Sequence, residues 1–149
     1  MKLIIIDIDG VLNNGDTTER VRPPEGGSYI GIDPILMERF RTIVIKTDAH
    51  IVLSTTWRKF EFFRDHLLEK MGDIASRVIG DTPVLDWKSR AEEINAWISS
   101  HPEIKIDKFI VIDDLGCDDL DSFGESFIQT YYHDGLTEEL MQKCIEKLS

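Results

Sequence analysis

Residues 2–10 decide the fold class, and they read Lys2-Leu3-Ile4-Ile5-Ile6-Asp7-Ile8-Asp9-Gly10. The run from Lys2 to Ile8 is almost wholly apolar, which is typical of a short strand buried on both faces of a parallel sheet. Side chains two apart in an extended segment point the same way, so Asp7 and Asp9 are expected to face one site. Gly10 has no side chain and lets the backbone turn sharply after them. The stretch therefore predicts a buried strand that ends in two convergent carboxylates.

Two other apolar runs also end in polar groups. The run 50–53 leads into Ser54-Thr55-Thr56, and the run 109–112 leads into Asp113-Asp114. Parallel strands present their carboxyl ends at one edge of the sheet, where α/β proteins bind their ligands. We therefore expect these hydroxyls and carboxylates to meet the first carboxylate pair at a single site.

Strands alternate with helical patterns along the chain, which predicts an α/β fold with a mainly parallel, five-stranded sheet flanked by helices. The expected strands are 2–8, 50–53, 76–79, 109–112 and 127–131. A first helix is expected to begin at Asp33-Pro34, and three more are expected over 58–71, 89–99 and 136–148. The apolar stripe of the first helix consists of Ile35, Leu36, Phe40, Ile43 and Val44. Residues 13–32 are polar and rich in Gly and Pro, so they predict a loop or small flap within a single domain of residues 1–149.

The composition is that of a globular protein, with 149 residues, 42% of them hydrophobic, and a net charge of −11. No stretch approaches the roughly 20 apolar residues that span a bilayer, so we expect a soluble, cytoplasmic protein with no membrane partner. The two cysteines lack metal-ligand spacing and are expected to be reduced. The negative charge opposes extended binding to nucleic acid, which needs a basic surface, but it permits contact with a terminal nucleotide in a small pocket.

The acidic pairs Asp7/Asp9 and Asp113/Asp114 offer hard oxygen ligands of the kind that Mg²⁺ prefers beside water and a substrate phosphate. An isolated Asp-x-Asp-Gly is equally compatible with acids that merely end a strand. The second pair, at the end of another apolar strand, favours a metal site assembled from two separate segments.

Hydroxyl and basic side chains supply candidates for holding a phosphate. Ser54 and Thr55 lie at a strand-to-helix junction, and a helix N-terminus favours an anion, although a helix cap is the simpler interpretation. Arg58 is placed either to reach a phosphate or to form an ion pair on the surface. Lys88 and Arg90 begin the third predicted helix, where the macrodipole disfavours cations, so one of them is expected to serve a bound anion.

Taken in order, these motifs resemble those of the haloacid dehalogenase (HAD) superfamily, which implies its Rossmannoid fold. The matching segments are Asp7-Ile8-Asp9-Gly10-Val11-Leu12, Ser54 after Ile51-Val52-Leu53, Arg90 or Lys88, and Asp113-Asp114 after Ile110-Val111-Ile112. The resemblance implies an Mg²⁺-dependent phosphatase in which Asp7 attacks phosphorus and forms an aspartyl-phosphate. Asp9 would protonate the leaving oxygen and then activate water. An acid/base aspartate at this position argues against dehalogenation, because the dehalogenases of the superfamily lack it.

The resemblance also implies the remaining roles. Mg²⁺ would be held by the Asp7 carboxylate, the Asp9 main-chain carbonyl and Asp113, with Asp114 nearby or acting through water. Phosphate oxygens would be held by Ser54 and the main chain of Thr55, with Gly10, Arg58 and Lys88 as further contacts. Arg90 would offset the charge of the transferring group.

A closer resemblance is to the small HAD domains of Swiss-Army-Knife RNA repair proteins. It is carried by Ser54-Thr55-Thr56-Trp57-Arg58, Arg90-Ala91-Glu92-Glu93-Ile94 with Trp97, Asp113-Asp114, and Gly135-Leu136-Thr137. The sequence departs from the superfamily at the third motif, where lysine is more usual than Arg90. The short insert leaves no room for a large cap domain, so the site is expected to be open, or covered by a flap or another subunit.

This resemblance and the missing cap favour a nucleotide or a phosphorylated nucleic-acid end as substrate, with a small phosphorylated metabolite as the alternative. Trp57 is expected to be a core residue, with stacking on a base as the alternative. Two other classes of protein share parts of the pattern. A response-regulator-type phosphoacceptor domain places its adjacent acidic pair early in the chain, whereas here the adjacent pair comes late. A catalytically silent interaction domain would keep the fold without the activity.

Overall fold

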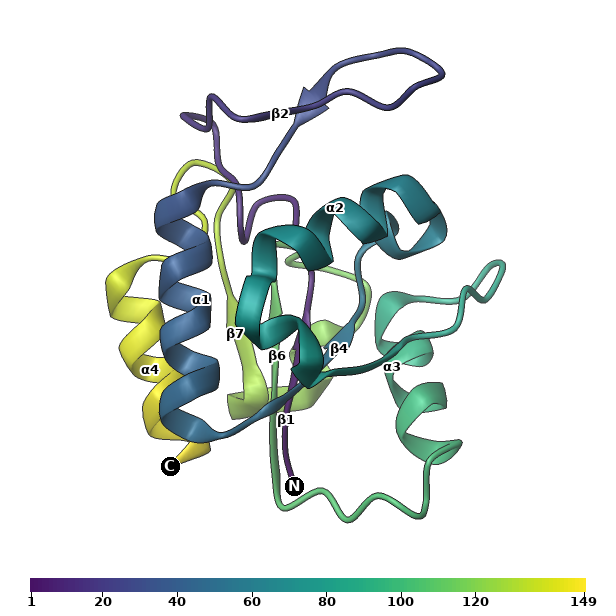
Figure 1. Cartoon of the computed structure of the whole chain (residues 1–149). Helices are drawn as coiled ribbons and strands as arrows, with labels where there is room; N and C mark the ends of the chain where they lie inside the picture. Colours follow the sequence, from purple (N-terminus) through teal and green to yellow (C-terminus); the bar gives the residue numbers. More distant parts are fainter.

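The apolar run that follows Met1 forms the central strand of a five-stranded sheet in the computed structural model, which describes residues 1–149 (Figure 1). The strands are β1 (Lys2–Ile6), β4 (His50–Leu53), β5 (Val78–Asp81), β6 (Lys108–Asp113) and β7 (Phe127–Gln129). Their order is β5-β4-β1-β6-β7, and all neighbouring strands are parallel. The predicted α/β class and five-stranded sheet are confirmed. β5 lies two residues later than expected, and β1 and β7 each end two residues earlier.

Helices cover both faces of the sheet (Figure 1). One face carries α1 (Pro34–Thr47), α2 (Glu61–Met71) and α4 (Glu138–Leu148), and the other carries α3 (Arg90–Ser99). Side chains of β1 alternate between the two layers, because Ile4 and Ile6 join the core under α1 while Leu3 and Ile5 join the core under α3. This burial on both faces explains why the strand reads as a continuous apolar run.

Polar caps fix where the helices begin. Asp33 caps α1 by accepting hydrogen bonds from two backbone N–H groups, and Ser89 caps α3 in a capping box with Glu92. Thr137 caps α4 in the same manner as Asp33 caps α1, through a backbone N–H group. The expected stripe on α1 is correct except for Ile35, which is 64% exposed although Leu36 in the same turn is buried.

The predicted helix 58–71 is divided into two parts. A 3₁₀ turn, η1 (Thr56–Lys59), comes first, and Phe60 is then extended before α2 begins at Glu61. The Thr55 hydroxyl accepts a hydrogen bond from the N–H of Trp57 at 3.2 Å, which starts η1 directly at the end of β4. Two further 3₁₀ segments, η2 (Gly72–Arg77) and η3 (Leu120–Ser126), were not predicted.

The insert 13–32 folds as a hairpin of β2 (Arg20–Val21) and β3 (Tyr29–Ile30), which stands beyond the carboxyl ends of the strands and above α2 (Figure 1). The flap was predicted but its strands were not, because two-residue strands carry no readable alternation. The two ends of the insert meet, since Asp33 N donates to Leu12 O at 2.9 Å. The hairpin takes the place of a large cap domain. None of the helices is both long and apolar enough to cross a membrane.

Candidate active site

Strand register brings the two acidic segments together. The chain runs outward from β1 through β4 to β5, then crosses to β6 and β7 on the other side, so β1 and β6 flank the point where the strand order reverses. Ile6 pairs with Ile112, and the N–H of Asp7 donates to the carbonyl of Ile112 at 2.9 Å. Asp7 and Asp113 therefore leave the sheet side by side.

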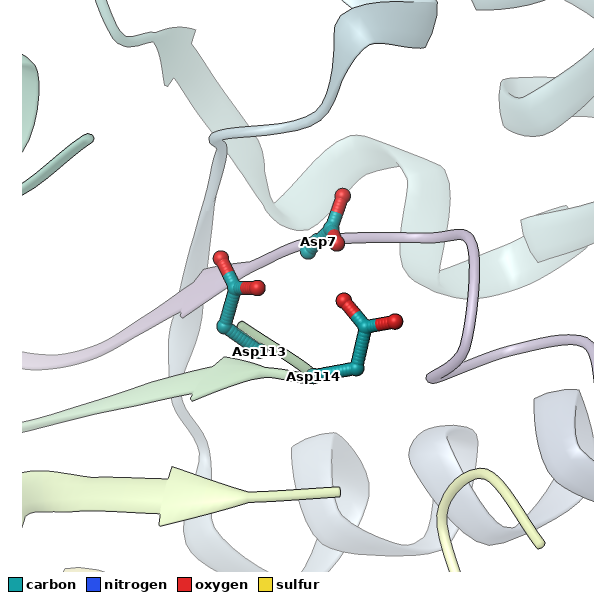
Figure 2. Close-up of side chains that lie close together, drawn as sticks. All are labelled: Asp7, Asp113 and Asp114. Carbon is teal, nitrogen blue, oxygen red and sulfur yellow. The ribbon is translucent and has the colours of Figure 1, made fainter. Parts of the chain in front are cut away.

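Three carboxylates share this position, those of Asp7, Asp113 and Asp114 (Figure 2). One oxygen from each lies within 4.8 Å of the others. Asp7 and Asp113 are buried, and Asp114 is partly buried. Asp113 is also fixed by its neighbours, since its Oδ1 accepts a hydrogen bond from Leu115 N at 2.9 Å. Three of the four carboxylates that were expected to converge thus lie together, whereas the Asp9 carboxylate does not join them. The predicted set of metal ligands, with the Asp9 main-chain carbonyl, stays a prediction.

Burial and mutual repulsion both disfavour the charged form of these carboxylates. Burial is the main reason why the pKa of Asp7 is raised well above its ordinary value, and the neighbouring Asp113 raises it further. The pKa of Asp114 is also raised, by its burial and by Asp113. Hard oxygen ligands that repel one another in a partly dry site suit a small divalent cation such as Mg²⁺. The residues present therefore fit the predicted metal.

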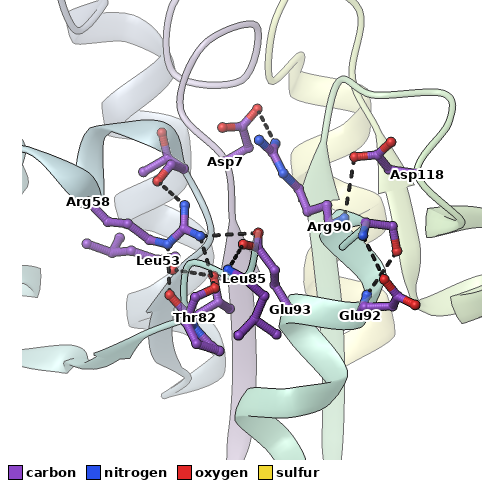
Figure 3. A network of polar contacts seen from close by, with 12 residues as sticks. Asp7, Leu53, Arg58, Thr82, Leu85, Arg90, Glu92, Glu93 and Asp118 are labelled. Carbon is purple, nitrogen blue, oxygen red and sulfur yellow. Dashed lines mark hydrogen bonds and ion pairs between the residues drawn. The ribbon is translucent and has the colours of Figure 1, made fainter. Parts of the chain in front are cut away.

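Arg90 is the only cation that forms ion pairs with this group, and it pairs with two of the three carboxylates. Its Nη1 lies 3.2 Å from Asp7 Oδ2 (Figure 3). The same atom lies 2.8 Å from Asp113 Oδ2. Burial lowers the pKa of Arg90, but the two carboxylates outweigh that effect and raise it. Arg90 thus pairs with carboxylates of the chain itself, and its expected role toward a bound anion stays a prediction. Lys88 is exposed and forms no ion pair, so Arg90 is the better candidate for the basic residue of the third motif.

Arg58 does not face the carboxylates, and its expected contact with a phosphate is not supported. Its guanidinium donates to the main-chain carbonyls of Thr55, Thr82 and Pro83 and pairs with Glu93 at 3.2 Å (Figure 3). The side chain is only 3% exposed. Arg58 therefore ties η1 to the loop before α3, and each of its three side-chain nitrogens already donates a hydrogen bond.

Gly10 allows Asp114 to enter the site. Its φ is +79°, a value that favours glycine, and a Cβ atom at this position would overlap with Oδ2 of Asp114. The Gly10 carbonyl accepts a hydrogen bond from Thr130 Oγ1 at 2.7 Å, which fixes the turn. The requirement for glycine thus comes from the carboxylate beside it. The predicted contact of Gly10 with a phosphate stays a prediction.

Asp9 lies apart from the three carboxylates and is exposed. Its carboxylate accepts hydrogen bonds from Trp57 Nε1 at 3.2 and 3.3 Å and from Asn13 Nδ2 at 2.9 Å. Asn13 is buried, and it also accepts from Gly10 N and donates to Gly31 O. Asp9 is therefore held in one orientation while staying open to solvent.

Trp57 and Asn13 are the functional neighbours that the sequence did not reveal. Trp57 is 4% exposed and belongs to the core, as expected, and its indole N–H is the part directed at Asp9. Asn13 was expected only to be one of several polar residues in a loop. A buried indole needs a hydrogen-bond acceptor, and this requirement is the signal that could have indicated a polar partner for Trp57.

Ser54 offers an unused hydroxyl at the same edge of the sheet. Its main-chain N–H donates to Ile6 O at 2.9 Å, which places it next to Asp7 at the end of the neighbouring strand. The side chain is 1% exposed, and its Oγ has no hydrogen-bond partner in the chain. A buried hydroxyl without a partner is costly, and an oxygen of a bound phosphate would satisfy it. Thr55 is buried beside it and caps η1 with its own hydroxyl.

A cavity of about 680 Å³ opens beside Asp9, between the hairpin and the η1–α2 segment. Its wall includes the side chains of Asp9 and Trp57, and several aromatic residues line the rest. Asp9 thus borders a space large enough for a small organic molecule.

Comparisons with known proteins agree with this geometry. The sequence matches the family model described as "HAD domain in Swiss Army Knife RNA repair proteins" over residues 3–141. A proposed HAD superfamily (subfamily III A) hydrolase from Legionella pneumophila has a similar structure, with a TM-score of 0.53 at 15% identity over 99% of this chain and 85% of the other. A proposed 3-deoxy-D-manno-octulosonate 8-phosphate phosphatase from Vibrio cholerae gives a TM-score of 0.51 at 12% identity over 99% and 82%. No curated protein matches the sequence. At these identities the two structures share the fold alone.

Proposed function

The chain belongs to the family of HAD domains in Swiss Army Knife RNA repair proteins, and we propose that, as a phosphatase of this superfamily, it hydrolyses phosphomonoesters through Asp7 with Mg²⁺ as cofactor. The resemblance read from the motifs is thereby confirmed at the level of the family. Membership also favours a phosphatase over a response-regulator-type phosphoacceptor.

One observation carries the proposal. Asp7 lies at the switch point of the sheet with the guanidinium of Arg90 3.2 Å away on one side and the unpartnered hydroxyl of Ser54 at the end of the adjacent strand. A phosphoryl group placed against Asp7 would meet both a cation and a free hydroxyl. Such groups stabilise the charge that develops on transferring phosphoryl oxygens.

The chemistry follows from these positions. An oxygen of Asp7 attacks phosphorus and forms an acyl phosphate while the bond from phosphorus to the leaving oxygen breaks. Asp9, oriented by Trp57 and Asn13, donates a proton to that oxygen. Asp9 then takes a proton from water, which attacks the phosphorus of the acyl phosphate and releases phosphate and free Asp7.

Asp7 and Asp113 are the proposed metal ligands, together with the Asp9 main-chain carbonyl, and Asp114 is proposed to contribute directly or through water. When bound, Mg²⁺ would neutralise the carboxylates and the charge of the phosphate. Arg90 pairs with two of these carboxylates and would turn toward the transferring phosphoryl group as the metal takes over their charge.

For the substrate we favour a phosphate at the end of a nucleotide or nucleic acid. The family description refers to RNA repair, and the hairpin leaves the site more open than a large cap would. The net charge of −11 limits contact to a few terminal nucleotides. A small phosphorylated metabolite is the alternative. We also propose that residues 1–149 act as a single domain and work in the cytoplasm.

The experiment that tests the proposal is a phosphate-release assay with Mg²⁺ on a matched panel. The panel contains oligonucleotides with a 3′- or a 5′-phosphate, mononucleotides and sugar phosphates at equal concentration. We expect release from nucleotide or oligonucleotide phosphates to be fastest. A clear preference for sugar phosphates would move the substrate to the metabolite class, and no release from any member would contradict the phosphatase itself.

The two basic residues before and within α3 give a matched pair of variants. We expect Arg90→Ala to lower kcat/KM by about 100-fold or more, because it removes the only cation beside Asp7. Lys88→Ala is expected to change it by less than about twofold, because an exposed charge contributes little. Both values come from initial rates of phosphate release. The opposite ranking would assign the basic role to Lys88.

A further inference from the structure

The cavity beside Asp9, which we call the hairpin cavity, has aromatic residues from three segments of the chain in its wall. Tyr29 comes from β3, Phe60 and Phe63 from the η1–α2 segment, and Tyr132 from the loop after β7. Figure 1 shows why these segments meet, since the hairpin reaches over the start of α2. Tyr29 is 50% exposed and Phe60 59%, so much of each ring remains uncovered.

The position of the hairpin cavity assigns it to the leaving group. Asp9 lies in its wall, whereas the phosphoryl contacts Asp7, Arg90 and Ser54 lie outside it. On the proposed function, Asp9 gives its proton to the leaving oxygen, so the atoms beyond that oxygen lie on the Asp9 side. We propose that the hairpin cavity binds the nucleoside of one terminal nucleotide, with Tyr29 and Phe60 as the residues that stack on its base. This inference rests on the proposed function and extends it to the residues that select the substrate.

The aromatic wall is suited to a flat ring. Phe63 contacts both exposed rings edge to face, with centroid distances of 5.3 Å to Tyr29 and 6.2 Å to Phe60. Phe63 also contacts Trp57 in the same geometry at 5.3 Å. The rings are therefore anchored to the core before any ligand arrives, which lowers the entropy cost of binding. Stacking on aromatic rings is worth about 1–3 kcal/mol per base.

Polar groups at the rim favour a nucleoside over other aromatic leaving groups. Arg20, Glu25 and Ser28 line the same cavity. Arg20 uses Nε and Nη2 on Ser28, which leaves Nη1 free. A base edge and ribose hydroxyls carry donors and acceptors for these groups, whereas a phenol ring such as that of phosphotyrosine has only its ester oxygen. A volume of about 680 Å³ is also larger than a single phenyl ring requires.

The charge of the cavity wall limits the ligand to one nucleotide. Asp9 and Glu25 contribute two carboxylates and Arg20 one cation. A second phosphodiester in this space would meet net negative charge on a protein that already carries −11. The base is therefore expected to be recognised while the rest of a strand extends into solvent.

The test compares kcat/KM for a nucleoside monophosphate with that for ribose carrying the phosphate on the same hydroxyl. The wild-type chain is expected to prefer the substrate with the base. Tyr29→Ala and Phe60→Ala are each expected to lower this preference by about 5- to 100-fold, the equivalent of losing one stacking contact. Tyr29→Phe keeps the ring and is expected to keep the preference. Trp87→Ala removes a fully exposed aromatic side chain outside the cavity and is the matched control. It is expected to leave kcat/KM for both substrates unchanged.

The outcomes separate this inference from the proposed function. Equal kcat/KM with and without a base, or an unchanged preference in both alanine variants, would overturn the role of the cavity and leave the phosphatase standing. The inference would also be overturned if the two alanine variants lost more kcat/KM on phosphotyrosine than on the nucleoside monophosphate. No release from any substrate would contradict the proposed function and this inference together. Thermal unfolding of each variant confirms that the ratio is measured on folded protein.

Discussion

Asp7→Asn is expected to abolish phosphate release while leaving the chain folded. An amide is a poor nucleophile and a weaker ligand for Mg²⁺, so both the proposed covalent step and the metal site are lost. We expect kcat to fall at least about 1,000-fold, which corresponds to about 4 kcal/mol of transition-state stabilisation. The measurement is phosphate release at saturating substrate with Mg²⁺. Comparable activity in a preparation free of wild-type protein would sink the assignment of Asp7.

The same substitution is expected to raise the stability of the metal-free chain at neutral pH. The pKa of Asp7 is raised in the folded state, mainly by burial. Between the ordinary aspartate pKa and this raised pKa, the folded chain therefore keeps a proton that the unfolded chain has released. Its contribution to stability is therefore lost as the pH rises from the ordinary aspartate pKa through the raised one. The amide of the variant carries no charge to bury, so the metal-free Tm is expected to rise by a few degrees and to depend less on pH in that window.

A matched substitution separates the site from a general loss of charge. Asp119 is an exposed acid in the loop after Asp114, and Asp119→Asn makes the same chemical change outside the carboxylate group. It is expected to leave both phosphate release and the metal-free Tm unchanged. A similar Tm increase in both variants would mean that net charge, and not the buried site, controls the stability.

Removal of divalent cations is expected to abolish activity, and Mg²⁺ alone is expected to restore it. Asp7, Asp113 and Asp114 lie within 4.8 Å of one another with Arg90 as their only cation, so a phosphate dianion would be repelled from the metal-free site. The measurement is phosphate release in excess chelator, followed by titration with Mg²⁺. Full activity in chelator would contradict the assignment of the cofactor.

Thermal unfolding measures the binding of Mg²⁺ independently of turnover. A ligand that binds only the folded chain adds about 2.7 kcal/mol at a concentration 100 times its Kd, so Mg²⁺ is expected to raise the Tm. Asp113→Asn removes one of the buried carboxylates and is expected to shrink that increase. An equal increase in this variant and in wild type would place the bound cation elsewhere.

The fold and the carboxylate site were predictable because both follow from local chemistry. Continuous apolar runs mark strands that are buried on both faces, and parallel strands bring the acids at their ends together. Asp7 and Asp113 therefore needed no structure to be placed in one site. The hairpin was not predicted as strands, because two-residue strands make their bonds through the backbone and leave no pattern in the side chains.

The directions of individual polar side chains were less accessible to sequence. Arg58 follows the hydroxyl cluster closely and was expected either to reach a phosphate or to form an ion pair on the surface. It is instead buried, and it donates to three main-chain carbonyls and to Glu93. Two of those carbonyls belong to a distant loop, so their positions depend on tertiary packing. The link from Trp57 to Asp9 has the same origin, because it requires η1 to be folded against the turn after β1, whereas Asn13 bonds to Asp9 within that turn.

The two ends of the insert lie together where Asp33 N bonds to Leu12 O, and Gly15 N bonds to Tyr132 O in the loop after β7. Lengthening, shortening or exchanging the loop between β2 and β3 would leave the register of β1, β4 and β6 untouched, since no strand of the main sheet passes through it. The hairpin, which is proposed to select the substrate, can then evolve under different constraints from the strand ends, which carry the proposed reacting residues. A duplicated copy of this gene could acquire a new substrate by changing the insert, provided that Asn13 and the joined ends are kept.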